Sequence, residues 1–139
     1  MISYNTVGVE MPPIDQPRVS AWVRQVAERY GKKVGDINFI FVNDEEILRI
    51  NREYIQHDYY TDHIGFDYSS GNVLSGDVFI GVETVASNAE LIGETYRREL
   101  HRVIIHGVLH LCGIKDKTPE LRMQMEAAEN AALALAVWL

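Results

Sequence analysis

The chain has a single cysteine, Cys112, among its 139 residues, and this scarcity excludes an internal disulfide framework. Basic residues are also few, because 13 Lys and Arg stand against 20 Asp and Glu and give a formal net charge of −7. Proteins that coat polyanions in general need net or strongly clustered positive charge. The composition therefore disfavours that class and leaves room for a local basic patch only.

Long apolar runs are missing as well. The longest one, Ala131–Leu139, is far shorter than the roughly 20 residues that span a bilayer. The first residues have neither the basic nor the apolar region of a signal peptide. Together with a hydrophobic content of 47%, these absences predict a soluble, cytoplasmic protein that forms one domain over residues 1–139.

The patterns that are present belong to both strands and helices. Strands are predicted over short apolar runs, namely Ile2–Glu10, Ile37–Val42, His63–Tyr68 and Val73–Val82. Helices are predicted from apolar periodicity and from end signals: Val19–Tyr30, a helix after Asn43, Thr84–Leu91, Glu94–Cys112, and a last one from Thr118. Because the two kinds of element do not alternate regularly, the predicted fold class is α+β, a small mixed sheet packed with helices.

Two segments carry more detailed expectations. Asn43 is predicted to cap its helix with Glu46 as the reciprocal partner of a capping box. The same helix is predicted to carry along one side the residues Ile47, Leu48, Asn51, Tyr54 and Ile55. The apolar C-terminal run Ala131–Leu139 either docks on the domain or mediates self-association, and the sequence does not choose between them.

The segment that indicates chemistry is 97–116, RRELHRVIIHGVLHLCGIKD. On a helical wheel His106 and His110 lie about 40° apart on a narrow polar stripe, next to Arg102, and aliphatic residues take most of the remaining surface. Two imidazoles at this spacing can bind one metal ion at about 2.0–2.1 Å. The alternative is a pair of hydrogen-bonded core histidines, although burying two imidazoles without partners is costly.

The residues after this pair favour the metal. Gly113 is predicted to end the helix in the left-handed conformation and to turn the chain back, which presents Asp116 as a third ligand. Three protein ligands leave one position for a water molecule that the metal acidifies. Gly107 occupies the position where metalloprotease helices carry a general-base glutamate, so a zinc peptidase is only a minor alternative.

The run from His106 to Gly113, HGVLHLCG, resembles the metal motif of the YbeY family, whose common form is HGxLHLxGxDH. Two upstream segments are similar to further family patterns. Asn51-Arg-Glu-Tyr54, Asp58 and Thr61-Asp62-His-Ile-Gly-Phe66 match the block N-x-x-Y-R-x-x-D-x-x-T-D-V-L-S-F, and Gly76-Asp77-Val78-Phe79-Ile80 matches the strand G-D-I-x-I. The resemblance extends from about residue 37 to the final helix.

This resemblance implies a zincin-like fold, one bound zinc ion, and a metal-dependent endoribonuclease that cleaves single-stranded RNA. It also implies a role in maturation of the 16S rRNA 3′ end and in ribosome quality control, alongside the small ribosomal subunit. The expected metal ligands are His106, His110 and Asp116. Asp116 stands where the motif has its third histidine, and its negative charge makes Mn²⁺ relatively more acceptable.

A second departure concerns positive charge, because the arginine of the upstream block falls on Ile55. Arginine would hold phosphate oxygens and offset charge that develops during cleavage. Its loss favours a rival function, a ribosome-assembly or RNA-binding module with a structural metal. The candidates to supply the missing charge are Arg102, Lys115 and Lys117.

Other polar residues are interpreted conservatively. Thr61-Asp62 is expected to be a cap or turn, with orientation of a metal-bound histidine as the alternative. His57 and His63 are interpreted as surface or strand residues and are not assigned to the metal. Arg97 and Arg98 form either part of a basic patch or a solvated helix face. The motif itself contains no general base, and a carboxylate from elsewhere in the chain is left unidentified.

Overall fold

A four-stranded mixed sheet lies at the centre of the part of the chain that this computed structural model describes, residues 1–55 and 61–139. The strands are β1 (Ile2–Val7), β2 (Lys33–Val42), β3 (His63–Asp67) and β4 (Val73–Gly81). Their order is β1-β2-β4-β3. β1, β2 and β4 are parallel, whereas β3 pairs antiparallel with β4 at one edge. The predicted fold class, α+β with a small mixed sheet, is confirmed.

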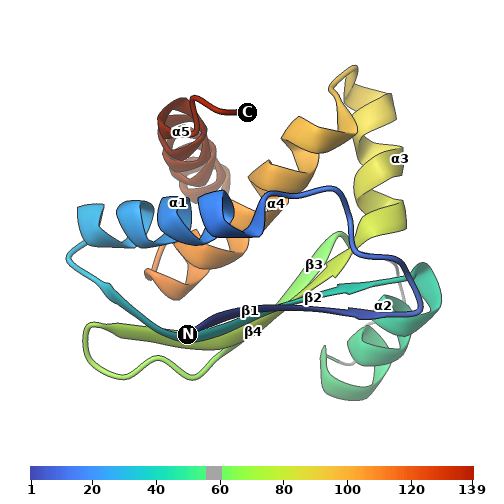
Figure 1. Cartoon of the computed structure of the whole chain (residues 1–139), viewed down its shortest axis with the longest axis horizontal. Coiled ribbons are helices and arrows are strands. Elements are labelled where there is room, and N and C mark those ends of the chain that lie inside the picture. Colours follow the sequence, from blue (N-terminus) through green and yellow to red (C-terminus); the bar gives the residue numbers. More distant parts are fainter. Residues whose placement is uncertain (56–60) are drawn as a thin grey trace.

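Helices cover the two faces of the sheet unequally (Figure 1). The helices on one side are α1 (Gln16–Arg29), α4 (Tyr96–Leu111) and α5 (Pro119–Leu135), and α3 (Val82–Ile92) leads from β4 into α4. The other face carries α2 (Asp44–Ile50), which continues into the π-helical turn η1 (Asn51–Ile55). Within the described ranges, no helix combines the length and the apolar character needed to cross a membrane.

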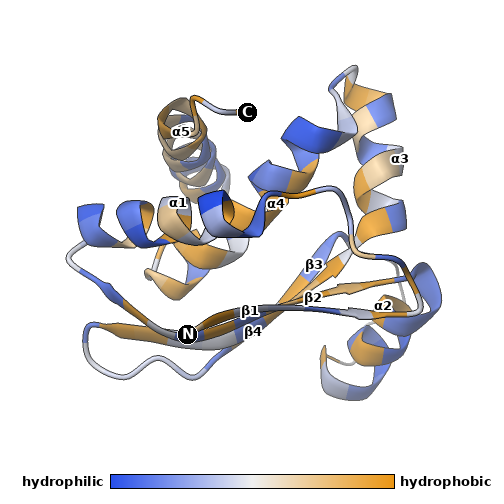
Figure 2. Cartoon of the chain, in the orientation of Figure 1, coloured by the Kyte–Doolittle hydropathy of each residue, from blue (hydrophilic) through white to orange (hydrophobic). Residues whose placement is uncertain are grey.

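The strand β2 shows how the sheet divides the core. Its residues Ile37, Phe39 and Phe41 are fully buried in the main cluster, which also contains apolar residues of α1, α4 and α5. Ile40 and Val42, which point the other way, belong to a smaller cluster with α2. In Figure 2 the first turns of α4 are hydrophilic and its later turns, which carry most of its residues of the main cluster, are largely hydrophobic. The main cluster therefore fixes α4 against the sheet.

The helix ends follow the predicted signals. The side chains of Asn43 and Thr118 each accept a hydrogen bond from the backbone N–H three residues later, which makes them N-caps of α2 and α5. Gly93 ends α3 in the left-handed conformation, with φ of 72°. The capping box after Asn43 is incomplete, because the carboxylate of Glu46 binds the guanidinium of Arg49.

The residues along the end of this helix differ in exposure. Ile47, Ile50 and Asn51 are buried, whereas Tyr54 and Ile55 are exposed. The last two lie in the π-helical turn η1, and the ring of Tyr54 contacts that of Phe66 of β3 at a centroid distance of 5.7 Å. His57 and Asp58 lie outside the described residues.

The C-terminal run Ala131–Leu139 docks on the rest of the chain. Ala132, Leu133 and Ala136 are buried in the main cluster. The indole Nε1 of Trp22 donates a hydrogen bond of 2.8 Å to the carbonyl of Ala132, which ties α1 to α5. Arg97 donates to the carbonyl of Trp138 at 3.1 Å, so its guanidinium serves this docking.

A buried histidine lies beneath this docked segment. His101 of α4 is 1% exposed, and its ring contacts the rings of Trp22 and Trp138 at centroid distances of 6.2 and 5.4 Å. Its Nδ1–H donates to the carbonyl of Arg97, while Nε2 has no hydrogen-bond partner among the described residues. Burial lowers the pKa of His101 because the charged form would lose its hydration.

We predict that His101 makes the protein less stable at acidic pH. Below a pH of about 6.5, His101 binds a proton in the unfolded chain but not in the folded protein. The free energy of unfolding therefore falls as the pH decreases. In His101→Phe, which keeps an aromatic ring between the two tryptophans, this component is absent. Urea unfolding of both proteins between pH 7.5 and 5.5 should show the wild type losing more stability. A pH-independent difference between them would contradict this role.

Candidate metal centre

The helix α4 holds His106 and His110 close to the sheet because Gly107 lies between them. A Cβ at position 107 would lie 2.7 Å from Cγ1 of Val78, a fully buried residue of β4. Glycine at this position therefore lets α4 approach the sheet closely. The two imidazoles then face the edge of the sheet where β3 begins, with their ring centroids 4.6 Å apart.

The turn after α4 brings Asp116 back to the two histidines. Gly113 adopts φ of 100°, and the N–H of Ile114 bonds the carbonyl of Leu109 at 3.1 Å, so the chain reverses as predicted. The Oδ2 atom of Asp116 lies 3.4 Å from Nε2 of His106 and 3.3 Å from Nε2 of His110. Neighbouring ligands of a tetrahedral zinc ion are about 3.3–3.4 Å apart, since each lies about 2.0–2.1 Å from the metal.

A third imidazole, that of His63, joins this cluster. Ligand atoms of His63, His106 and His110 all lie within 4.8 Å of one another, which is compatible with one shared metal ion. The His63 ring is 4.4 Å from the ring of His106 and 5.8 Å from that of His110. His63 is a strand residue, as one of its two interpretations predicts, but the strand places its ring beside the two histidines of α4. The spacing of histidines along α4 cannot reveal it, because β3 contributes it from across the sheet.

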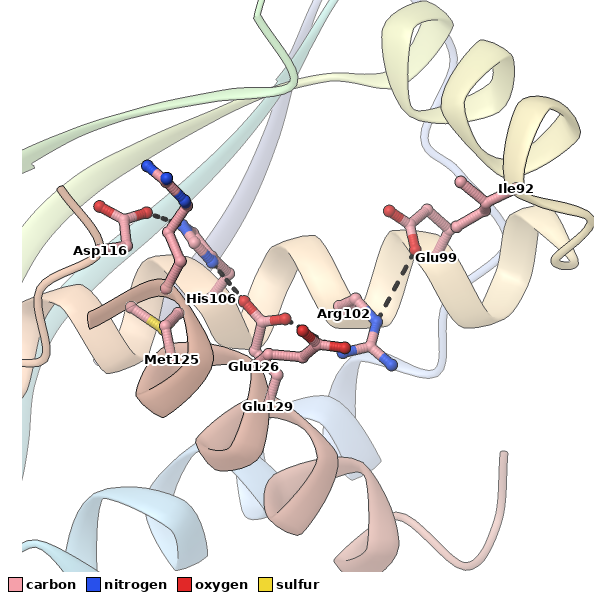
Figure 3. A pocket seen from close by; sticks show the side chains of 9 residues that line it. Ile92, Glu99, Arg102, His106, Asp116, Met125, Glu126 and Glu129 are labelled. Carbon is pink, nitrogen blue, oxygen red and sulfur yellow. Dashed lines mark hydrogen bonds and ion pairs between the residues drawn. The ribbon is translucent and has the colours of Figure 1, made fainter. Parts of the chain in front are cut away.

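Two carboxylates hold the outer nitrogens of these rings. Glu129 of α5 accepts a hydrogen bond from Nδ1 of His106, and Asp62 accepts one of 2.8 Å from Nδ1 of His63 (Figure 3 shows the Glu129 side). Metal-binding histidines usually donate their second N–H to a carboxylate or carbonyl, which fixes the tautomer and the ring orientation. The sequence predicts Asp62 to be either a cap or turn residue or a residue that orients a histidine, and its hydrogen bond favours the second. No local pattern in the sequence indicates Glu129.

These contacts have opposite effects on the pKa values of the site. Burial on its own would lower the pKa of His106, but the hydrogen bond and charge of Glu129 outweigh it and raise that pKa. Burial and the neighbouring His106 lower the pKa of His110. Burial would raise the pKa of Asp62, but its hydrogen bond with His63 and the charges of His63 and His106 together lower it. Asp62 therefore ionises more readily, and His110 loses its proton more readily, than the same groups in water.

One further observation supports a metal ion at this site. Nε2 of His106 is buried and has no hydrogen-bond partner among residues 1–55 and 61–139, yet it points toward Asp116 and the other two histidines. A buried polar atom without a partner is costly. A cation among these nitrogen and oxygen atoms would remove that cost, and the donor set of imidazoles and carboxylate suits zinc.

Comparisons with known proteins agree with this site. A sequence model of the endoribonuclease YbeY family matches residues 7–136. The chain belongs to this family. Curated relatives named endoribonuclease YbeY include a protein of Phocaeicola vulgatus that is 60% identical, with the match covering 97% of this chain and 98% of the relative. Another, from Bacteroides thetaiotaomicron, is 56% identical, and the match covers 96% of this chain and 98% of the relative. A solution structure of a Thermotoga maritima protein, 23% identical in sequence, aligns with a TM-score of 0.66 over 96% of this chain and 90% of that protein, which shows the same fold.

In this YbeY-family chain two cavities meet at the histidines. One, of about 440 Å³, contains the carboxylates of Asp116 and Glu129 together with Arg102 (Figure 3). The other, of about 700 Å³, is lined by His63 and His110 and by the exposed residues Ile55, Lys115 and Lys117. The lysines lie on only one side of the metal site. That side is the one that suits a polyanion.

The three basic candidates differ in their surroundings. Arg102 donates to Glu129 and to Asn130 at 3.0 Å each, and its Nε lies 3.8 Å from the carboxylate of Glu99. Its charge is therefore balanced by two carboxylates, and it holds Glu129 in place against His106. Lys115 and Lys117 are exposed in the larger cavity. Of the three candidates, the two lysines are thus the ones that line the larger cavity beside His63 and His110.

We predict that Glu129 tightens metal binding through His106. In Glu129→Gln the acceptor of the Nδ1–H loses its charge, and loss of such a partner typically weakens metal affinity about 10- to 100-fold. A matched control is Glu126→Gln, because Glu126 lines the same cavity on the same helix but is exposed. Competition with a chromophoric chelator measures the affinity. Equal affinities in both variants would contradict the role of Glu129.

Proposed function

We propose that the chain is a metal-dependent endoribonuclease that cleaves single-stranded RNA, formed by one domain over residues 1–139. The observation that carries this proposal is the cluster of His63, His106 and His110 at the end of a cavity lined by Lys115 and Lys117, in a chain of the endoribonuclease YbeY family. The cluster offers a site for a metal, and the lysines offer a path for an anionic chain of phosphates.

The metal ion in this proposal is zinc, with Mn²⁺ as an acceptable substitute, and its ligands include His106, His110 and Asp116. The separations of 3.4 and 3.3 Å between the Asp116 oxygen and the two imidazole nitrogens support this set. When bound, the ion would act as a Lewis acid and lower the pKa of a water molecule, which makes a hydroxide nucleophile available at neutral pH to attack a phosphodiester.

The side chains around the ion have separate tasks. Lys115 and Lys117 bind phosphate oxygens and place the scissile bond beside His110. Glu129 and Asp62 accept hydrogen bonds from the Nδ1–H groups of His106 and His63 and so orient these rings beside the ion. Arg102 holds Glu129 in position.

The substrate and the cellular context follow from the family. We infer that the RNA is ribosomal and that the enzyme acts in the cytoplasm on the 3′ end of 16S rRNA, alongside the small ribosomal subunit and in ribosome quality control. The names of the relatives, endoribonuclease YbeY, support an RNA substrate. The net charge of −7 supports binding through a local patch, since the rest of the surface repels RNA.

A second candidate is a ribosome-assembly module with a structural metal. Two observations favour it: Ile55 lines the larger cavity where the family block has arginine, and four side chains with ligand atoms gather at the site, as in closed structural zinc centres. A zinc peptidase is disfavoured, because Gly107 has no side chain to act as the general base of a metalloprotease helix.

Metal removal tests the proposal directly. The purified protein should contain about one equivalent of metal and should cleave single-stranded RNA. Chelation should abolish cleavage, and zinc or manganese should restore it. His110→Ala and Asp116→Ala should both weaken metal binding and cleavage together.

The alternatives give different results in the same assays. Metal binding without cleavage of any single-stranded RNA would favour the assembly module. Cleavage by the metal-free protein would contradict a metal-dependent reaction, and the absence of metal after supply of zinc or manganese would leave an RNA-binding domain. Unchanged metal binding in Asp116→Ala would remove that residue from the ligands.

We predict that Lys115 and Lys117 determine RNA binding rather than metal binding. Lys115→Ala and Lys117→Ala should each weaken RNA binding and reduce the dependence of log K on log salt by about 0.7, the value for one phosphate contact on a single strand. Metal content should not change. Lys33→Ala, at the start of β2 and outside both cavities, is the control. If all the alanine variants, Arg102→Ala included, bind and cleave RNA as the wild type does, the assignment fails.

A further inference from the structure

We propose that His63 is a ligand of the metal ion, so that the ion is held by three imidazoles, two from α4 and one from β3, together with the carboxylate of Asp116. This inference rests on the proposed function only in requiring a metal ion at the site. It adds to the HGVLHLCG segment a ligand that lies 43 positions before the first histidine of that segment.

The location of His63 carries the first part of the argument. It is the first residue of β3, the edge strand, and its ring packs against both imidazoles of α4 at centroid distances of 4.4 and 5.8 Å. A nitrogen of His63 lies within 4.8 Å of ligand atoms of both His106 and His110. His63 also lines two cavities, one of about 310 Å³ that contains the carboxylates of Asp62 and Glu129, and the lysine-lined one of about 700 Å³.

The hydrogen bonds of His63 carry the second part. Its Nδ1 bonds Asp62 at 2.8 Å, just as Nδ1 of His106 bonds Glu129. In both rings Nδ1 is thereby engaged by a carboxylate, which leaves Nε2 to accept a metal. A carboxylate–histidine pair that points at a common centre is the usual support of a metal ligand. An imidazole with only a structural role would not need the same arrangement.

The positions of the ligand atoms carry the third part. Ligand nitrogens of His63, His106 and His110 lie within 4.8 Å of one another, and an oxygen of Asp116 lies 3.4 and 3.3 Å from Nε2 of His106 and His110. Nε2 of His106 is buried and has no hydrogen bond within the described ranges, which is costly. A divalent cation among these atoms would contact all four side chains and remove that cost.

Four protein ligands change what the ion can do. Zinc sites with four protein ligands are usually structural, but catalytic sites can also expand to five ligands. The cavity of about 700 Å³ that opens beside His63 and His110 provides the space from which a further ligand can approach. His63 therefore strengthens metal retention and does not close the site to the substrate.

The test measures ligands and affinity separately from RNA cleavage. Zinc K-edge X-ray absorption counts imidazole ligands, and we expect three in the wild type and two in His63→Val, in which a β-branched residue preserves the strand. Competition with a chromophoric chelator should show zinc affinity falling by more than about 100-fold, because loss of a ligand costs more than the 10- to 100-fold typical for loss of its partner. Asp62→Asn should keep three imidazoles and bind zinc about 10- to 100-fold more weakly.

The matched control is Asp67→Asn, which changes a residue of the same strand and the same cavity without removing an imidazole. It should bind zinc as the wild type does, and thermal unfolding of the metal-free proteins should be similar for all variants. Two imidazoles in the wild type, or unchanged zinc affinity in His63→Val, would overturn the inference. Three imidazoles with no RNA cleavage would uphold His63 as a ligand and reject the endoribonuclease.

Discussion

The close approach of α4 to β4 at Gly107 is the contact on which the rest of the structure depends. A side chain at this position would collide with Val78, so only glycine lets the helix lie this near the sheet. The same approach buries the aliphatic residues of α4 in the main core and brings His106 and His110 to the edge where β3 begins. Core packing and ligand placement are therefore set by one contact, and a change in the spacing of helix and sheet alters both.

Around this contact, separate elements contribute different chemistry to one centre. α4 supplies two imidazoles, the turn after it supplies Asp116, β3 supplies His63, and α5 supplies Glu129. Carboxylates gather on the side toward α5, while Lys115 and Lys117 lie on the side toward β3 and η1. An acidic protein can thus keep a cation at the site and still present positive charge to a nucleic acid along one approach.

The local signals in the sequence predict a large part of this arrangement, because helix caps, the glycine turns and the histidine spacing act over a few residues. Thr118, Gly93, Gly113 and the pair on α4 behave as expected for this reason. His63 and Glu129 join the site through the packing of elements remote in sequence, which no local pattern encodes. The π-helical turn that holds Tyr54 and Ile55 likewise has no signal in the helical periodicity.

The hydrogen bond between Glu129 and His106 also joins the last helix to the metal. α5 is tied to α1 through Trp22 and to α4 through Arg102 and His106, so its docking and the orientation of a ligand share the same contacts. Thermodynamic linkage then makes metal occupancy a source of folding stability, about 2.7 kcal/mol when the free ion is at 100 times its dissociation constant. The C-terminal helix would be held most firmly when the ion is bound, and its detachment would release the ion.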